Sequence, residues 1–337
     1  MHATTGRENF QSSAGPVSGH FWTVLPAIAG ALLPSLLPAS QPFEATVEDP
    51  VVGRVLLSGL HMNHPRSDTL VVLIHGLGGD AISPYIRAAA RATVHCGLSA
   101  LCLSMRGADG SGEDIFHGGL TEDIRAALAS PDLARYRRIH LMGFSVGGHL
   151  ALKAALDRVD ARLAAVAAIC PPLDLDLATI AFDHPSRAFY RRHVFANVNR
   201  VYERAAARRR FLTPACQVRR ARFCRERDAM TVVPRFSFQS PEDYYKRESV
   251  ATRIHQLDIP SLLVAAVYDP IVPAYTLRAA IGDASDALTV RWVERGGHVY
   301  FRSDLDLGFG GALGLEPQVL QWLAVQQPPG SVKRFRS

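Results

Sequence analysis

The sequence predicts an α/β fold in which helices cover both faces of a mostly parallel central sheet. Short, continuous apolar runs such as residues 70–74 (LVVLI) recur along the chain, as expected for strands that are buried on both faces. Longer helix-like segments separate these runs, and a repeated order of strand then helix is typical of a parallel sheet. Several of the runs end in glycine-containing turns, so functional loops are expected at the carboxyl ends of the strands.

The order of the elements follows from the same patterns. Residues 43–62 alternate in short β-like pieces and predict an antiparallel hairpin that opens the sheet. Buried strands are expected at residues 70–74, 98–103, 139–142, 163–169, 262–267 and 288–293. Helices are expected at residues 84–95, at 121–129, after GFSVGG to about residue 158, and at about 316–325.

The strand–helix rhythm stops in one segment, residues 172–257, which is rich in arginine and aromatic residues. This segment has helical stretches but no buried-strand run. We therefore expect a helical insertion at residues 172–257 within an α/β core that consists of residues 43–171 and 258–327. Residues 1–42 are expected to form an N-terminal segment packed on the body of the protein.

Composition sets further bounds on the class of protein. The 337 residues are 48% hydrophobic and 20% charged, which is ordinary for a packed globular chain. The net charge of +6 comes mainly from arginines, which cluster between Arg187 and Arg227. No nucleic-acid-binding motif accompanies them, so we expect no nucleic-acid partner and a solvated helical surface, with a lipid headgroup or acidic substrate as the alternative. The five cysteines lack the spacing of a disulfide framework or metal site, which favours a reducing compartment.

The apolar stretch from Phe21 to Ala39 is long enough to suggest a signal peptide or a membrane span. Pro26, Pro34 and Pro38 interrupt it, and only Arg7 supplies positive charge upstream. We therefore expect a segment that lies on the protein, with membrane contact and a cleaved signal as alternatives. The expected location is the cytoplasm, with membrane association as the alternative.

The strongest chemical signal is the pentapeptide from Gly143 to Gly147 (GFSVG), a G-x-S-x-G motif between a buried strand and a helix. In this context the serine, Ser145, occupies a sharp turn whose close packing requires glycines at both motif ends. Its hydroxyl then points over the carboxyl edge of the sheet. The motif predicts that Ser145 is a nucleophile.

A second motif, HGLGG from His75 to Gly79, directly follows the first buried parallel strand. An acyl-transfer enzyme needs two backbone N–H donors for the oxyanion of its tetrahedral intermediate. Val146, which follows the nucleophile, and Leu77, in this glycine-rich turn, are the expected donors. Gly76 lets the backbone approach the substrate, and His75 is expected to fix the loop by hydrogen bonds.

A serine nucleophile also needs a base and a carboxylate that orients the base. Asp269 ends one late strand, in DPIVP, and His298 follows the next, in GGHVYF. The chain order of serine, acid and histidine fits a parallel-sheet hydrolase. Asp174 and Asp176 are rival candidates for the acid. This mechanism requires no metal ion and no organic cofactor.

The motifs HGLGG, MRGADG, HGGLTEDI, GFSVGGHLAL, PEDYYKRES, YDPIVP and GGHVYF together resemble the YheT-like branch of the α/β hydrolases. The resemblance runs from about Gly19, where GHFWTVLP is similar to an N-terminal His-x-x-Thr segment of that branch, to about Trp322. It implies carboxylester hydrolysis by Ser145, Asp269 and His298, and a lid over an acyl pocket. Tyr268 departs from the branch, which often has a second acidic residue there.

Three functions are compatible with these residues. The first is a serine esterase or lipase-like hydrolase that cleaves short- to medium-chain or lipid-like carboxylic esters through an acyl-serine intermediate, with a small-molecule ester as its partner. The second is an acyltransferase or a peptidase that uses the same triad. The third is a catalytically inactive hydrolase-fold protein that binds a ligand. The motifs determine neither the oligomeric state nor the acyl chain length.

Overall fold

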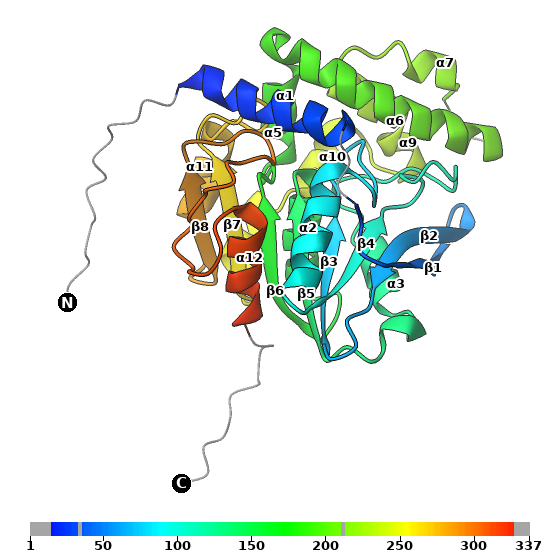
Figure 1. Cartoon of the computed structure of the whole chain (residues 1–337). Helices are drawn as coiled ribbons and strands as arrows, with labels where there is room; N and C mark the ends of the chain where they lie inside the picture. The colour runs from blue at the N-terminus through cyan, green and yellow to red at the C-terminus, as the bar shows by residue number, and fades with distance from the viewer. Residues whose placement is uncertain (1–14, 33–35, 210–212, 327–337) are drawn as a thin grey trace.

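The computed structural model describes residues 15–32, 36–209 and 213–326 (Figure 1). The strands are β1 (Gln41–Asp49), β2 (Gly53–Met62), β3 (Thr69–Ile74), β4 (Ser99–Ser104), β5 (Arg138–Phe144), β6 (Leu163–Ile169), β7 (Ser261–Ala266) and β8 (Leu288–Val293). The helices outside the β6–β7 connection are α1 (Pro16–Leu32), α2 (Pro84–His95), α3 (Glu122–Leu128), α4 (Val146–Leu156), α11 (Tyr275–Gly282) and α12 (Leu315–Ala324).

One eight-stranded sheet organises the molecule, in the order β1-β2-β4-β3-β5-β6-β7-β8. β1 and β2 form an antiparallel hairpin, β2 is antiparallel to β4, and every later pair is parallel. The predicted fold class is confirmed, including the hairpin at residues 43–62 and the strands that follow it. The predicted strand boundaries agree closely. β3, β4, β6 and β7 are buried on both faces, whereas β8, at the edge of the sheet, is only partly buried.

The two faces of the sheet carry separate apolar cores. Successive side chains of a strand point to opposite faces, so Val72 of β3 packs in one core and its neighbour Val71 in the other. Side chains of α3, α4 and α11 complete the first core, and those of α2 and α12 complete the second. Helices on both faces are what the repeated strand–helix order predicts.

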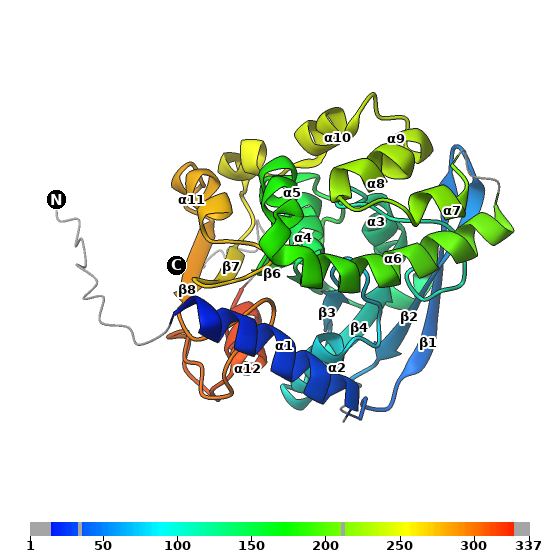
Figure 2. The same ribbon diagram turned by 90° about the horizontal axis from the view of Figure 1, so that it is seen from above.

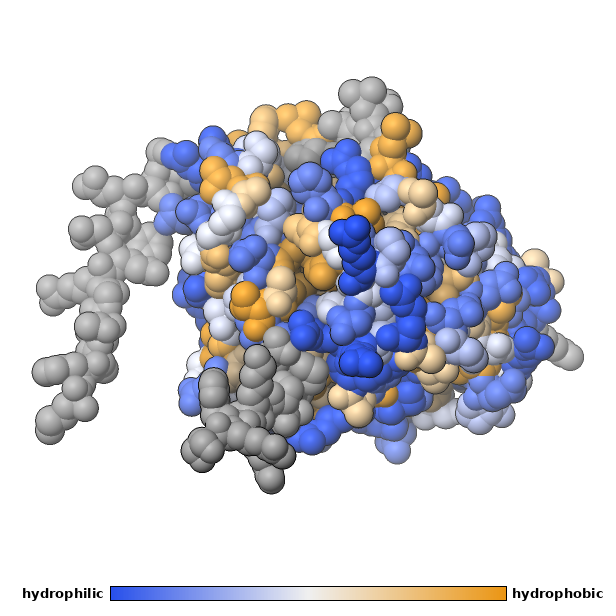
Figure 3. All heavy atoms as spheres, turned by 60° about the horizontal axis from the view of Figure 1, so that its bottom comes forward, coloured by the Kyte–Doolittle hydropathy of each residue, from blue (hydrophilic) through white to orange (hydrophobic). Residues whose placement is uncertain are grey.

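Within its described residues, the connection from β6 to β7 contains six α-helices, which we call the insertion helices. They are α5 (Leu175–Asp183), α6 (Ala188–Arg208), α7 (Ala215–Val218), α8 (Cys224–Met230), α9 (Val232–Arg235) and α10 (Pro241–Glu248). In Figures 1 and 2, α6 and α1 lie side by side at the top of the molecule. They contact each other through His20 and Tyr190, where the imidazole Nδ1 is 2.6 Å from the phenol oxygen. The opposite face, toward the viewer in Figure 3, mixes hydrophilic and hydrophobic residues, as solvated surfaces do.

The expectation of a solvated arginine surface between Arg187 and Arg227 is wrong for several of these residues. Arg191 and Arg227 are each 7% exposed. Arg191 donates to the carbonyls of Phe182 and Arg222, so it joins two of the insertion segments. Charge alone could not separate such structural arginines from solvated ones.

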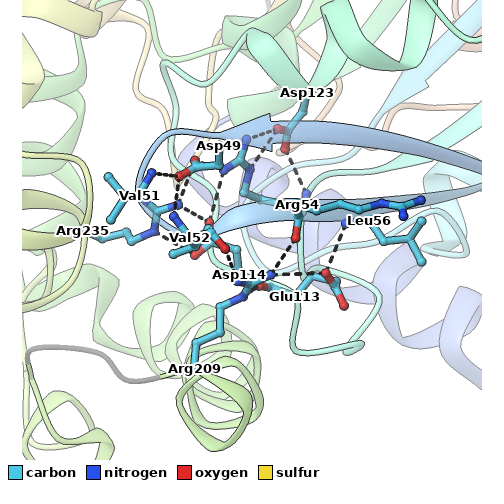
Figure 4. A network of polar contacts seen from close by, with 11 residues as sticks. Asp49, Val51, Val52, Arg54, Leu56, Glu113, Asp114, Asp123, Arg209 and Arg235 are labelled. Atoms are coloured by element: carbon cyan, nitrogen blue, oxygen red, sulfur yellow. Dashed lines mark hydrogen bonds and ion pairs between the residues drawn. The ribbon is translucent and has the colours of Figure 1, made fainter.

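The insertion helices are also tied to the start of the sheet through a buried ionic network (Figure 4). At its centre, Arg106 contacts the carboxylates of Asp49, Asp114 and Asp123 at 2.7, 3.2 and 2.6 Å. Arg235 of α9 reaches Asp49 at 2.8 Å and Asp114 at 2.5 Å. The network therefore joins the β1–β2 hairpin, the loop after β4 and the insertion in one structure.

The N-terminal helix α1 continues through Pro26, although prolines were expected to interrupt this apolar stretch. Within the described residues, no helix combines the length and the apolar character that crossing a lipid bilayer requires.

Candidate active site

Ser145 lies at the turn between β5 and α4, with φ of 54° and ψ of −123°. Such a conformation is rare for a residue with a side chain and is kept only where the surroundings enforce it. A Cβ on Gly143 would lie 2.0 Å from the carbonyl oxygen of Gly147, and one on Gly147 would lie 2.3 Å from that of Ile74. Both glycines are therefore required for the turn to close.

Two backbone N–H groups near Ser145 are available to a ligand. Val146 is the first residue of α4, so its N–H has no acceptor within the helix. Neither it nor the N–H of Leu77 has a hydrogen-bond acceptor in the part of the chain that the structure describes. Gly76 brings the loop against the nucleophile, because a Cβ there would lie 3.1 Å from that of Ser145.

His75 fixes this loop from beneath. Its Nε2 accepts from the N–H of Met105 at 3.1 Å, and its Nδ1 lies 2.8 Å from the carbonyl oxygen of Gly76. Nδ1 therefore carries the proton and donates to that carbonyl. Burial lowers the pKa of His75, which keeps the ring neutral, as this bonding requires.

Asp269 and His298 meet at the carboxyl ends of β7 and β8. The imidazole Nδ1 lies 2.8 Å from Oδ2 of the carboxylate, and both side chains are buried. The other carboxylate oxygen accepts from the N–H groups of Ile271 and Val272 at 2.8 and 2.9 Å. These bonds fix the carboxylate and leave His298 Nε2 as the ring nitrogen available to a substrate or nucleophile.

The rival acids are used elsewhere. Asp174 caps α5 by accepting from the N–H of Leu177 at 2.9 Å. Asp176 forms an ion pair with Arg225 on the insertion helices. Asp269 is the candidate acid that the structure brings to His298.

A cavity of about 560 Å³ lies between the core and the insertion helices. Ser145, His298, Leu77 and Val146 all line it. Apolar and aromatic side chains from α5, α6 and α10 form a large part of the rest of its wall. A volume of this size suits a small organic substrate, and the four candidate residues face the same space.

Helix α1 supports the histidine loop from the other end of the chain. The N–H of His298 donates to the hydroxyl of Thr23 at 2.8 Å. Glycines permit this close approach. A Cβ on Gly297 would lie 2.4 Å from this hydroxyl, and one on Gly19 would lie 1.8 Å from the carbonyl oxygen of Tyr268. The sequence motifs alone did not predict this support. Its signal was the resemblance of GHFWTVLP to a His-x-x-Thr segment.

One group of described side chains has the donor types and spacing of a metal site. The potential ligand atoms of Cys170, Asp269 and His298 all lie within 4.8 Å of one another. The Cys170 thiol lies 3.7 Å from the carbonyl oxygen of Gly297, and the Asp269 carboxylate already contacts His298 and accepts from two backbone N–H groups. The donor set therefore fits a hydrogen-bonded acid–histidine pair with a thiol packed behind it better than it fits a metal centre.

Comparisons with known proteins agree with this architecture. A family model described as the alpha/beta hydrolase fold matches residues 69–301. The chain is 25% identical over 272 residues to the putative esterase YheT of Escherichia coli (strain K12), which covers 77% of this chain and 75% of that protein. It is 25% identical over 236 residues to medium-chain fatty acid ethyl ester synthase/esterase 2 of Saccharomyces cerevisiae, covering 60% of this chain and about half (51%) of the yeast protein.

Solved structures extend the comparison to the fold. An esterase of Pyrococcus furiosus has a TM-score of 0.52 at 17% identity, with 79% of this chain and 90% of that chain covered. At this identity the likeness concerns the fold alone. The esterase-named relatives support ester hydrolysis at a general level. With a family model matching most of its length, the chain belongs to the α/β-hydrolase family and resembles the YheT-like branch.

Proposed function

We propose that this protein is a serine hydrolase that cleaves carboxylic esters through an acyl-serine intermediate, with Ser145 as nucleophile, His298 as base and Asp269 as orienting acid. The observation that carries the proposal is the 2.8 Å contact between His298 Nδ1 and Asp269, with His298 on the wall of the cavity that Ser145 also lines. The strained turn at Ser145 is further support.

In this mechanism His298 Nε2 takes the proton of the Ser145 hydroxyl as its oxygen attacks the ester carbonyl. The N–H groups of Val146 and Leu77 stabilise the oxyanion, each by roughly 3 kcal/mol in comparable sites. The protonated histidine then gives its proton to the departing alcohol. Water, activated by the same histidine, attacks the acyl-serine and releases the acid.

The mainly apolar cavity favours short- to medium-chain acyl or lipid-like esters as the small-molecule partner. Residues 172–257 are proposed as a lid over residues 43–171 and 258–327, with residues 1–42 packed on that body. Support comes from the position of the insertion helices, which supply one side of the cavity wall, and from the contact of α1 with His298.

A fluorophosphonate probe tests the proposal directly, because it forms a covalent bond with an activated serine. We expect the wild type to be labelled, Ser145→Ala to be unlabelled, and an exposed-serine control such as Ser186→Ala to be labelled normally. A folded wild-type protein that resists labelling would support the inactive binding protein instead.

The same protein separates the remaining alternatives by substrate. p-Nitrophenyl esters of increasing acyl length should be cleaved, whereas peptide amides should be cleaved far more slowly. Faster cleavage of the amides would favour a peptidase. Faster transfer of the acyl group to an added alcohol than to water would favour an acyltransferase.

A further inference from the structure

The wall that the insertion helices contribute to the cavity is not purely apolar. Helix α8 presents Cys224, Arg227 and Asp228 to the cavity, which is the i, i+3, i+4 spacing of one helix face. Ser145 and His298 line the same cavity from the core, so a substrate bound at Ser145 can extend toward α8.

Asp228 is unusual because it is ionisable, largely enclosed and yet incompletely bonded. One oxygen, Oδ2, accepts from the hydroxyl of Tyr245 at 2.7 Å. The residue keeps part of its surface accessible while lining the cavity. In the described part of the chain, the carboxylate has no ion pair within 4 Å, whereas Asp49, Asp114 and Asp123 all face guanidinium groups.

The neighbouring groups do not neutralise this carboxylate directly. Arg227 uses its guanidinium on Val198, Asn199 and Thr231, all neutral acceptors at 3.2 to 3.5 Å. His117, which also lines the cavity, accepts the N–H of Gly119 through Nδ1. Burial lowers the pKa of His117 to about 3, so its ring is neutral at physiological pH.

Keeping a carboxyl group here destabilises the fold at neutral pH. Burial raises the pKa of Asp228 to about 6, although the charge of Arg227 and the hydroxyl of Tyr245 act in the opposite direction. A group that is costly to ionise and faces a substrate cavity is a candidate for ligand recognition.

We propose that Asp228 is a specificity-determining residue, which accepts a hydrogen bond from a hydroxyl or ammonium group on the part of the ester that extends away from Ser145. This inference rests on the proposed ester hydrolysis and adds a preference among esters. The carboxylate oxygen that Tyr245 does not occupy is the acceptor. A plain alkyl chain that displaces water from that oxygen offers it no hydrogen-bond donor, which costs binding free energy.

The test compares matched esters with the full-length enzyme. p-Nitrophenyl esters of four to eight acyl carbons are prepared with a terminal methyl, hydroxyl, ammonium or carboxylate group, together with hexanoate esters of hexanol and hexanediol. At one or more lengths we expect kcat/KM for the hydroxyl or ammonium ester to exceed that of the methyl ester by roughly tenfold, as for a hydrogen bond to a charged group.

Variants separate recognition from folding. Asp228→Asn should reduce this preference about tenfold, because the amide still accepts from Tyr245 but offers the cavity a different group. Its thermal midpoint should equal or exceed that of the wild type, since the buried charge is gone. Tyr245→Phe keeps the carboxyl group but removes a donor that favours its charged form, so it should weaken the preference less than Asp228→Asn does. Asp286→Asn, at an exposed position between α11 and β8, is the matched control and should change neither quantity.

The outcomes are distinguishable. If the wild type hydrolyses none of the esters, the proposed function fails and the inference fails with it. If it hydrolyses methyl and hydroxyl esters equally at every length, or if Asp228→Asn keeps the preference, the inference alone is overturned. A preference for the carboxylate ester would assign recognition to Arg227 and also overturn it. If the preference holds, the hydroxyl and ammonium arms decide which donor the cavity selects.

Discussion

Two buried polar regions of this protein hold their carboxylates in opposite ways. Around Arg106 the carboxylates contact guanidinium groups, and no member of this central cluster lines the cavity beside Ser145 (Figure 4). At the candidate active site, Asp269 contacts a histidine that faces the cavity. The burial of polar groups alone therefore does not indicate a functional site. A buried polar pair of which one member is still accessible to a ligand does indicate one.

The largest effect is expected from a substitution in the pair of Asp269 and His298. Asp269→Asn should reduce kcat for an ester by about 10⁴-fold, because the amide no longer holds the imidazole in the required tautomer. The amide oxygen can still accept from the N–H groups of Ile271 and Val272, so unfolding in urea should change little. A variant that retains more than a tenth of wild-type activity would remove Asp269 from the proposed triad.

The ionic network around Arg106 should respond in the opposite way, with a loss of stability and little loss of activity. Arg106→Met leaves Asp114 and Asp123 without their central guanidinium, and breaking a buried ion pair costs about 3–5 kcal/mol. We expect the free energy of unfolding in urea to fall by that amount, while the folded variant keeps kcat within a few-fold. Arg125→Met, at an exposed pair with Glu122, is the control and should cost less than about 1 kcal/mol.

The smallest effect is expected at a buried polar residue that belongs neither to the ionic network nor to the candidate active site. His140 of β5 is fully buried, and neither ring nitrogen has a hydrogen-bond partner among the described residues. His140→Leu should therefore raise stability by about 1–2 kcal/mol without affecting hydrolysis. Loss of stability on substitution would indicate that the ring makes a favourable interaction in the core.

This variant should also change the response to acid. Burial lowers the pKa of His140 from 6.5 to about 3, so the unfolded chain binds the proton more readily than the folded chain. With respect to this ring, the folded protein therefore keeps its full stability above pH 6.5. It loses stability as the pH falls toward 3, because the unfolded chain is protonated there more readily than the folded chain. Urea unfolding across this range should show a weaker loss of stability in His140→Leu than in the wild type.

Much of the fold was predictable because its central strands are buried on both faces. A run such as Leu163–Ile169 has no helical or alternating period, and the structure has β6 at those residues. The glycines around Ser145 could be identified because the turn excludes side chains at those positions. Such local requirements depend on only a few adjacent residues, so they can be recognised in the sequence.

Contacts between distant segments were not predictable in the same way. Nothing local to Thr23 indicates that its hydroxyl accepts from His298, and nothing local to Asp228 indicates that it faces the cavity. Tyr244 and Tyr245 are buried like core residues, but they also line the cavity. These features depend on how the insertion helices and α1 pack on the sheet.

The link between Thr23 and His298 spans 275 positions of the chain. During synthesis, Thr23 is made long before His298, so the bond can form only after the intervening residues have been added. Ester hydrolysis would then report that both of these segments are present and docked. Fragments released early, even those that already contain Ser145, would lack the assembled site.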